Sequence, residues 1–446
     1  MKDFYNLFVI YITKMVIFVM TDLLHRGSSF PGMFARKLNS DLLAYVSKGY
    51  KVVLITGTNG KTTTTSLIVK ALKDSGQKVI TNSSGANMYN GILTTFIKHY
   101  KSDEDKGYAI IEIDEANLKL VTPVIEPVAV CITNIFRDQL DRYGEVYTTM
   151  ELILEGITSE NTKLILNGDE PLFHFLKNKN EKIFFGFNAK LDNKIETNTE
   201  GCYCRDCNEQ YSYKSVTYNH LGDYFCENCG YSRPDLTYSV DEILSQSANS
   251  CEVVIDEIKT ELSIGGLYNI YNALCAYTVC KELGLESFDI LESLKSQKSA
   301  FGRQEVIKFN NKELVMLLVK NPVGYNEAIN SILLEDVDSS IAFVLNDNYA
   351  DGCDVSWIWD VNFEKIDTSK YNKLYFAGIR RYDMAIRLQV TGVNREDILV
   401  VNTLENLLEV LDKENCEKVY VFTTYTAMLE LRKLLHKGKH VNKLYS

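Results

Sequence analysis

Apolar residues follow two different spacings along this chain. Short and almost continuous apolar runs are typical of buried parallel strands, whereas apolar residues three or four positions apart are typical of helices. In the first half of the chain the runs alternate with helical stretches, which indicates βα units around a largely parallel sheet. The expected strands are Lys51–Ile55, Lys78–Thr81, Tyr108–Ile113, Val128–Ile132 and Leu164–Leu166.

A second βα series begins near Glu313 and indicates a separate Rossmann-like domain. Helical periodicity at Tyr268–Leu283 and Ser287–Leu294 lies between the two series. The second series contains expected strands at Glu313–Val319, Ile341–Leu345, Lys373–Phe376, Ile398–Val401 and Lys418–Phe422, with helices at Asn326–Leu333, Leu404–Leu411 and Thr426–Leu435.

The N-terminal run Phe4–Met20 is apolar but is interrupted by Asn6 and Lys14. It is shorter than the roughly 20 residues that a spanning helix needs, and no small-residue cleavage site follows it. We interpret it as a buried or docking helix. An interfacial membrane contact is the alternative.

Composition narrows the class of protein. The 446 residues are 46% hydrophobic and 24% charged, which is typical of a globular protein with two or three domains. The net charge of -11 argues against a general nucleic-acid binder, because no basic excess is present to neutralise phosphates. Eleven Cys without a secretory context indicate a reducing cytosol and thiols that bind metal or pack.

A Gly-bearing turn follows the first expected strand and opens a helix whose apolar face includes Leu67 and Leu72, with Gly76 as its stop. Backbone N–H groups at such a helix start can bind phosphate, Lys61 adds positive charge, and the Thr62 hydroxyl can bind Mg²⁺. The first Gly of the common P-loop would fall at Ile55. The turn nevertheless predicts ATP binding, through Gly57, Thr58, Asn59, Gly60, Lys61 and Thr62.

Acidic residues end the third expected strand at Glu112, Asp114 and Glu115. The carboxyl ends of parallel strands form the edge where open α/β sheets bind ligands. A carboxylate at this edge can hold the Mg²⁺ that bridges nucleotide phosphates.

Four cysteines have the spacing of a zinc ribbon: Cys204 and Cys207 form one C-x-x-C pair, and Cys226 and Cys229 form the other. Four thiolates can close a tetrahedral shell, which leaves no open position for catalysis. We therefore expect a structural zinc site on a small insertion without a core of its own. Cys202 could compete as a ligand, and we expect His220 to be a turn residue.

Further motifs follow in order, and together with the turn they resemble the Mur ligase superfamily. These ATP-dependent enzymes activate a carboxylate as an acyl phosphate, which an amine then attacks. The resemblance implies that Lys61 and Thr62 serve phosphates and Mg²⁺, that Glu112 serves Mg²⁺, and that Asn134, Asn269, Asn272 and Arg303 contact the nucleotide. The motifs are Thr133–Arg142, Asn167–Pro171, Tyr268–Leu274 and Gly302–Glu305.

The chain also departs from the amino-acid-adding members of that superfamily. Gln139 stands where they have a metal-binding His, and Thr148–Leu152 offers no Lys for carbamylation. The segment Leu318–Pro322 lacks their ribose-binding Asp. These departures imply that the acceptor amine is not a bulky amino acid held in the usual way.

With the Cys₄ insertion and the C-terminal domain, these departures resemble one branch, the ligase subunits of lipid II isoglutaminyl synthases. That resemblance implies that ATP phosphorylates the α-carboxylate of D-glutamate in the lipid II stem peptide, and that ammonia displaces phosphate to give D-isoglutamine. Ammonia would come from a class I glutamine amidotransferase subunit, GatD, in a heterodimer. It also implies a cytoplasmic enzyme that meets lipid II at the membrane surface. The C-terminal cues are Leu318–Gly324, Asn346–Gly352, Asp354–Asp360 and Arg380–Leu388.

The chain shows no glutaminase nucleophile of its own, because its other cysteines lack the Gly-x-Cys-x-Gly elbow. Family resemblance suggests that the acidic segment Asn346–Asp360 meets the glutaminase, where an Asp would orient the partner's catalytic His. We assign this role to Asp354, with Asp351 and Asp360 as alternatives. A solvated loop with an aromatic interface anchor is the simpler interpretation.

The expected fold is α/β, with three parts. Residues 1–46 form an N-terminal helical segment, residues 47–308 a Mur ligase-like central P-loop ATPase domain with a zinc-ribbon insertion at about 198–236, and residues 309–446 a Rossmann-like domain that contacts the glutaminase. Three other functions compete: a conventional Mur-type amino-acid ligase, a zinc-ribbon ATPase acting as an assembly or nucleic-acid factor, and a catalytically dead scaffold. The intact Lys61, Thr62 and Glu112 argue against the last.

Overall fold

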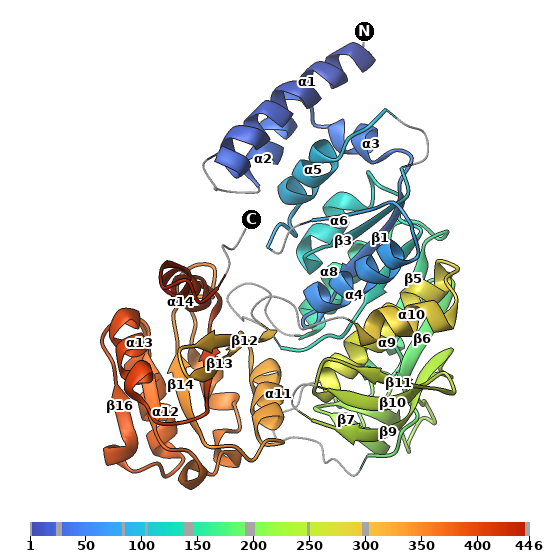
Figure 1. Ribbon diagram of the computed structural model, residues 1–446. Coiled ribbons are helices and arrows are strands. Elements are labelled where there is room, and N and C mark those ends of the chain that lie inside the picture. Colours follow the sequence, from blue (N-terminus) through green and yellow to red (C-terminus); the bar gives the residue numbers. More distant parts are fainter. Residues whose placement is uncertain are drawn as a thin grey trace.

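The computed structural model arranges the chain as two α/β units side by side, with a group of N-terminal helices beyond the first unit (Figure 1). The central unit holds a nine-stranded sheet, and the C-terminal unit holds a six-stranded sheet. The structure describes residues 2–23, 29–82, 85–102, 106–137, 146–191, 201–247, 250–296 and 303–441.

The first sheet is parallel over most of its width, in the order β11-β10-β9-β6-β5-β4-β1-β3-β2. Only its outer strands β10 and β11 run antiparallel to their neighbours. The central strand β1 pairs with β3 on one side and with β4 on the other. The strands are β1 Lys51–Thr56, β2 Val79–Thr81, β3 Tyr108–Glu112, β4 Ala129–Ile132, β5 Lys163–Asn167, β6 Lys182–Phe187, β9 Tyr238–Gln246, β10 Cys251–Ile255 and β11 Ile258–Leu262.

Helices cover both faces of this sheet, because its central strands are buried on both sides. Val53 and Ile55 of β1 pack into one core, and the alternate residues Val52 and Leu54 pack into the other. The first face carries α4 Lys61–Asp74, α9 Leu267–Glu282 and α10 Ser287–Lys295; the second carries α1 Lys2–Ile17, α2 Phe30–Leu38, α3 Leu42–Ser47, α5 Tyr89–Lys98, α6 Leu118–Val121 and α8 Val146–Glu155.

The second sheet has the order β12-β13-β17-β14-β15-β16, and only β12 is antiparallel to its neighbour. Separate cores lie on its two faces. Its elements are β12 Arg303–Phe309, β13 Lys312–Leu318, α11 Pro322–Ile332, β14 Ser339–Val344, β15 Leu374–Ala377, α12 Arg381–Val390, β16 Ile398–Val400, α13 Leu404–Lys413, β17 Lys418–Thr423 and α14 Tyr425–Lys437.

The predicted fold class is confirmed, and the predicted strands of both series are present with small shifts at their ends. The sequence analysis assigned no strand at β6, β9, β10, β11 or β12. In β9 and β11 many residues are polar or exposed and no continuous apolar run is present, whereas β6 and β10 carry short apolar runs that the analysis did not assign. The insertion forms the hairpin of β7 Ser212–Tyr218 and β8 Leu221–Phe225. Contrary to our expectation, it has a small core of its own, in which Tyr211 and Tyr224 pack against two of the cysteines.

Candidate active site

The turn between β1 and α4 has a backbone that only glycine adopts easily at two positions. Gly57 has φ 117° and Gly60 has φ 87°. A Cβ on Gly57 would lie 2.4 Å from Thr133 Oγ1, and one on Gly60 would lie 2.0 Å from Asn272 Oδ1. The turn is therefore a concave backbone cradle at a helix start, which is the shape that phosphate binding requires.

Lys61, Thr62 and Glu112 meet beside this cradle, as predicted from their positions at the ends of β1 and β3. The Thr62 hydroxyl donates to Glu112 Oε2 at 2.8 Å, so two oxygens of the kind that Mg²⁺ prefers lie together. Lys61 Nζ donates to the Gly57 carbonyl and forms an ion pair of 2.8 Å with Glu115. Burial raises the pKa of Glu115, and the Lys61 ammonium opposes that rise.

The residues after β4 hold the cradle from the side. Asn134 accepts from the Asn59 N–H at 2.9 Å and donates to the Asn59 carbonyl at 3.1 Å. The Thr133 hydroxyl also donates to that carbonyl, at 2.7 Å. Asn134 is therefore a positioning residue for the turn in this structure, while its predicted contact with nucleotide stays a prediction. Gln139, in the same motif, lies outside the described residues.

Two asparagines at the start of α9 lie on the other side of the cradle. Asn272 accepts from the Thr64 hydroxyl at 3.4 Å and donates to Asn269 at 3.2 Å. Asn269 is anchored in turn to the Gly265 carbonyl at 2.7 Å. The geometry brings Asn272 to the cradle with Asn269 behind it, while their predicted contact with nucleotide stays a prediction. Arg303 begins β12, but its side chain lies outside the described part of the structure.

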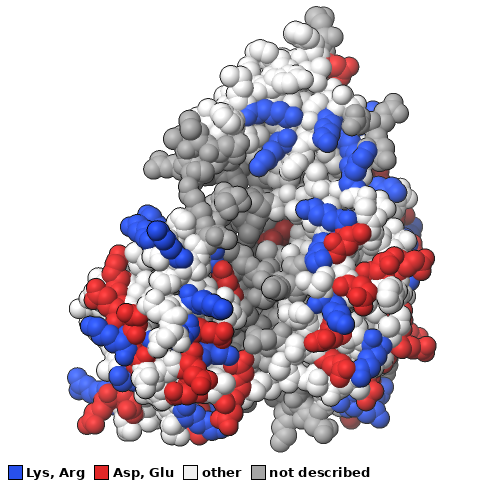
Figure 2. Space-filling view, viewed as in Figure 1, with Lys and Arg blue, Asp and Glu red and all other residues white. Residues whose placement is uncertain are grey.

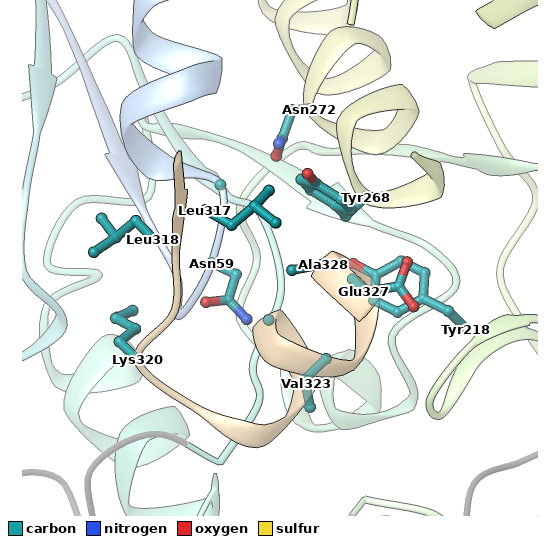
Figure 3. A pocket seen from close by; sticks show the side chains of 12 residues that line it. Asn59, Tyr218, Tyr268, Asn272, Leu317, Leu318, Lys320, Val323, Glu327 and Ala328 are labelled. Carbon is teal, nitrogen blue, oxygen red and sulfur yellow. The ribbon is translucent and has the colours of Figure 1, made fainter. Parts of the chain in front are cut away.

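A cavity of about 80 Å³ extends from the cradle to the C-terminal domain. Asn321 crosses the boundary between the two units and donates to Asn59 Oδ1 at 3.0 Å. Figure 3 shows side chains of both units around this cavity: Asn59, Tyr218, Tyr268 and Asn272 from the central unit, and Leu317, Leu318, Lys320, Val323, Glu327 and Ala328 from the C-terminal unit.

The Asn167–Pro171 motif ties the insertion to the site. Glu170 accepts from the Ile135 N–H at 3.1 Å and contacts His220 Nε2 at 2.7 Å. His220 occupies the expected turn, between β7 and β8, but its side chain is buried. Sequence reasoning missed this role, because a contact between residues 50 positions apart leaves no local signal.

Asp169 of the same motif joins three parts of the central unit. It pairs with Arg233 at 2.8 Å and accepts from the Tyr271 hydroxyl at 2.6 Å and the Phe187 N–H at 2.7 Å. Burial raises the pKa of Asp169, and the Arg233 guanidinium opposes that rise. The motif is thus a buried structural junction between β6, α9 and the insertion.

The four predicted cysteines converge at the tip of the insertion. Cys204 Sγ lies 3.5 Å from Cys229 Sγ, Cys207 Sγ lies 3.4 Å from Cys226 Sγ, and all four atoms lie within 4.8 Å of one another. Tetrahedral Zn²⁺ with bonds of about 2.3 Å holds its sulfurs about 3.8 Å apart, so the donor set fits zinc. Cys202 lies outside this cluster, and burial raises the pKa of its thiol to about 11.

The candidate aspartates of the C-terminal domain have different partners. Asp354 caps its own loop, accepting from the Ser356 N–H at 2.8 Å and from the Ser356 hydroxyl at 2.9 Å. Asp351 is buried and accepts from the Thr426 N–H at 2.7 Å. Asp360 pairs with Arg137 at 3.2 Å and so connects the loop to the motif beside the cradle. The predicted role of Asp354 toward a partner stays a prediction.

Comparison with known proteins agrees with this geometry. The Mur ligase middle domain matches residues 55–280, and the MurT ligase C-terminal domain matches residues 318–428. A curated relative from Streptococcus pneumoniae, lipid II isoglutaminyl synthase (glutamine-hydrolyzing) subunit MurT, is 43% identical over 94% of this chain and 95% of its own length.

Solved structures show the same fold. A pseudomurein peptide ligase type C from Methanothermus fervidus superposes with a TM-score of 0.66 at 22% identity, over 89% of this chain and 80% of its own. MurF ligase from Thermotoga maritima, solved in complex with ADP, superposes with a TM-score of 0.61 at 14% identity, over 91% of this chain and 85% of its own. The chain therefore belongs to the Mur ligase superfamily and, within it, to the MurT family.

Proposed function

We propose that this chain is the ligase subunit of a lipid II isoglutaminyl synthase. In the proposed reaction, the α-carboxylate of D-glutamate in the lipid II stem peptide attacks the γ-phosphorus of ATP and forms an acyl phosphate, with ADP as leaving group. Ammonia then attacks the carbonyl carbon, phosphate departs, and the nitrogen loses a proton to give the amide. The observation that carries this proposal is the cradle, with Lys61, Thr62 and Glu112 gathered around it.

The residues have separate roles in this scheme. The N-terminal amides of α4 and the Lys61 ammonium would stabilise the charge that develops on the transferred phosphoryl group. Thr62 and Glu112 would hold the Mg²⁺ that neutralises the phosphates. Glu115 keeps Lys61 paired at the site before nucleotide arrives. Asn269, Asn272 and Arg303 would contact the nucleotide, within or beside the cavity between the two units.

The departures from amino-acid ligases support ammonia as the acceptor. Ammonia is small and arrives neutral through a channel, so it needs no side-chain pocket of its own. The cavity is lined by Leu318, which begins the segment that stands where the amino-acid ligases have their ribose-binding Asp. A chain that uses ammonia needs a glutaminase, and we propose GatD, a class I glutamine amidotransferase, as partner in a heterodimer.

An apolar stripe on α12 supports a partner surface in the C-terminal domain. Tyr382, Ile386 and Val390 are four residues apart and all exposed. Trp359 is exposed on the neighbouring loop, with the Arg387 guanidinium 5.5 Å from its ring centre. Aromatic and aliphatic side chains beside arginine are typical of interface centres.

Ile386→Asp should weaken GatD binding about tenfold or more, whereas Phe288→Asp on α10, also exposed, should not.

Amidation of lipid II tests the proposed function directly. The purified chain, GatD, ATP, Mg²⁺ and glutamine should convert lipid II to a product in which one hydroxyl is replaced by an amino group, as mass spectrometry would show. Hydroxylamine in place of glutamine should trap the acyl phosphate as a hydroxamate. Glu112→Gln should remove both products. An adduct with a free amino acid, formed without GatD, would instead identify a conventional Mur-type ligase.

The proposed substrate places the enzyme at the inner face of the cell membrane, because lipid II carries a membrane-embedded lipid. We propose a cytoplasmic enzyme that acts there as a peripheral protein.

A further inference from the structure

Helix α1 has apolar side chains on two opposite faces, and only one of them is covered. Its inner face packs into the core over α2 and α5, with Val9, Ile10 and Ile17 buried. Its outer face consists of residues spaced four and three positions apart, which lie in one stripe on a helix. These residues are Phe4, Phe8, Tyr11 and Met15 of α1, and Phe18, which begins the helical segment Phe18–Leu23 directly after it, with exposed fractions of 78%, 52%, 66%, 70% and 60%.

This stripe is continuous and large. From Phe4 to Phe18 it extends about 21 Å along the helix axis at 1.5 Å per residue. Phe30 and Met33 of the adjoining helix α2 are also exposed. Apolar patches of this kind mark contacts with a protein or a membrane. By length and composition alone the helix Asp3–Met20 could cross a membrane, but its inner face packs into the core of the central unit.

The charge of this region favours a lipid surface over a protein. Residues 1–48 contain six Lys or Arg and three Asp, whereas the whole chain has 48 basic and 59 acidic residues. Arg36 and Lys37 are exposed on α2. Figure 2 shows Lys and Arg with very few acidic residues on this face of the N-terminal part, whereas both other parts show mixed charge. Aromatic residues beside basic ones are typical of helices that lie in an anionic membrane interface.

The position of the stripe also separates it from the proposed GatD surface. In Figure 1, α1 lies at the far end of the molecule from α12. A membrane contact through α1 therefore leaves the α12 stripe accessible to the partner.

We propose that the outer face of α1, extended by α2, lies in the interface of an anionic membrane and holds this enzyme at its lipid-linked substrate. This inference rests on the proposed function only for the identity of the substrate. The contact itself depends on the apolar stripe and the basic side chains.

The test is co-sedimentation of the full chain with vesicles, without ATP or lipid II. Wild type should bind vesicles of phosphatidylglycerol and phosphatidylcholine, and should bind phosphatidylcholine alone more weakly. The double variant Phe8→Glu/Met15→Glu should bind about tenfold more weakly or worse. Phe288→Glu, which changes an aromatic side chain exposed to 70% on α10, should bind like wild type.

Two further measurements separate apolar from electrostatic binding. Arg36→Glu/Lys37→Glu should lose about fivefold in affinity per residue at low salt, and only with the anionic vesicles. Brominated lipids should quench the tryptophan fluorescence of Phe8→Trp, a conservative change. They should not quench the fluorescence of wild type, whose only Trp residues are at 357 and 359. Because Phe8→Trp is not a disruptive substitution, misfolding cannot explain quenching of its fluorescence.

Binding of wild type that equals binding of the double variant, or no binding of wild type, would overturn the proposal. A double variant that loses self-association or GatD binding, by light scattering, would assign the stripe to a protein contact instead. If the enzyme amidates lipid II in detergent but does not bind vesicles, the membrane contact is refuted and the proposed function stands. If it binds vesicles but does not amidate lipid II, the proposed function is refuted and the membrane contact stands.

Discussion

The two sheets use the same backbone device for different purposes. After β1 the chain turns through Gly57 into α4, and after β15 it turns through Gly378 into α12. Both glycines have positive φ, 117° and 91°, and a Cβ would lie 2.4 Å and 2.5 Å from a neighbouring oxygen. In both cases a strand ends, a glycine reverses the chain, and a helix begins at the carboxyl edge of a parallel sheet.

The side chains around the two turns differ. At β1, Lys61, Thr62 and Glu112 surround the helix start, which suits an anion with its metal. At β15, Asn346 accepts from the Ile379 N–H at 2.9 Å, and the exposed side chains are Ile379 and Tyr382. The comparison indicates that the fold supplies a place for a ligand, and that a few side chains decide which kind of ligand fits: in our proposal, a nucleotide at the first turn and a partner at the second.

The largest effect should come from the charge at the first turn. Lys61→Ala should lower the rate of lipid II amidation about 10²- to 10³-fold, because one charged donor to the phosphoryl group is lost. Lys70→Ala, on the same helix but paired with Asp74 near the surface, should change the rate little. A steady-state assay with ATP checks both. Equal losses in the two variants would show that the helix, not the cradle, had been damaged.

At the second sheet, Asp354→Asn should lower glutamine-dependent amidation about 10²-fold and leave amidation with ammonium salts unchanged, because its predicted role is to orient the partner's His. Asp367→Asn is a matched control, since Asp367 accepts from the Ser369 N–H at 3.2 Å and from its hydroxyl at 2.6 Å in the same kind of turn. Unchanged glutamine hydrolysis in Asp354→Asn would refute the assignment.

Loss of the zinc site should lower activity indirectly, through the contacts between the insertion and the residues beside the first turn. Cys226→Ser should abolish zinc binding, make residues 201–236 sensitive to protease, and lower amidation about tenfold. The reason is that His220, in the turn of the hairpin, contacts Glu170, and Arg233, which follows the hairpin, pairs with Asp169. Cys353→Ser changes an exposed cysteine outside the cluster and should leave zinc binding and the protease resistance of residues 201–236 unchanged. Full activity of the zinc-free protein would show that the insertion is independent of the site.

Substitution of the glycines themselves should have its smallest effect on activity and act mainly on stability. Gly57→Ala and Gly378→Ala should each lower the free energy of unfolding by about 2–3 kcal/mol, from positive φ and overpacking together. Only Gly57→Ala should also weaken nucleotide binding, measured by calorimetry. Gly284→Ala has a similar φ, 89°, but no neighbour within 4 Å, and should cost only about 1 kcal/mol. Weaker nucleotide binding in Gly378→Ala would contradict the comparison.

Much of this arrangement was predictable from local sequence. The apolar run before Gly57, the Lys-Thr pair after it, and the acidic end of β3 place Lys61, Thr62 and Glu112 at one sheet edge. The two C-x-x-C pairs likewise predict a cluster that the structure brings together. The strands β9 and β11 were not predictable in the same way, because polar residues interrupt their apolar pattern.

The sequence by itself therefore determined most of the elements around the site and the order in which the motifs follow, since strand, turn and helix signals depend on neighbouring residues. Only the tertiary structure decided which motifs meet. Lys61 pairs with Glu115 across 54 positions, His220 meets Glu170 across 50, and Asn321 reaches Asn59 across 262. It also decided that one apolar face of α1 is buried and the other exposed, because burial depends on what packs against a helix and not on the helix itself.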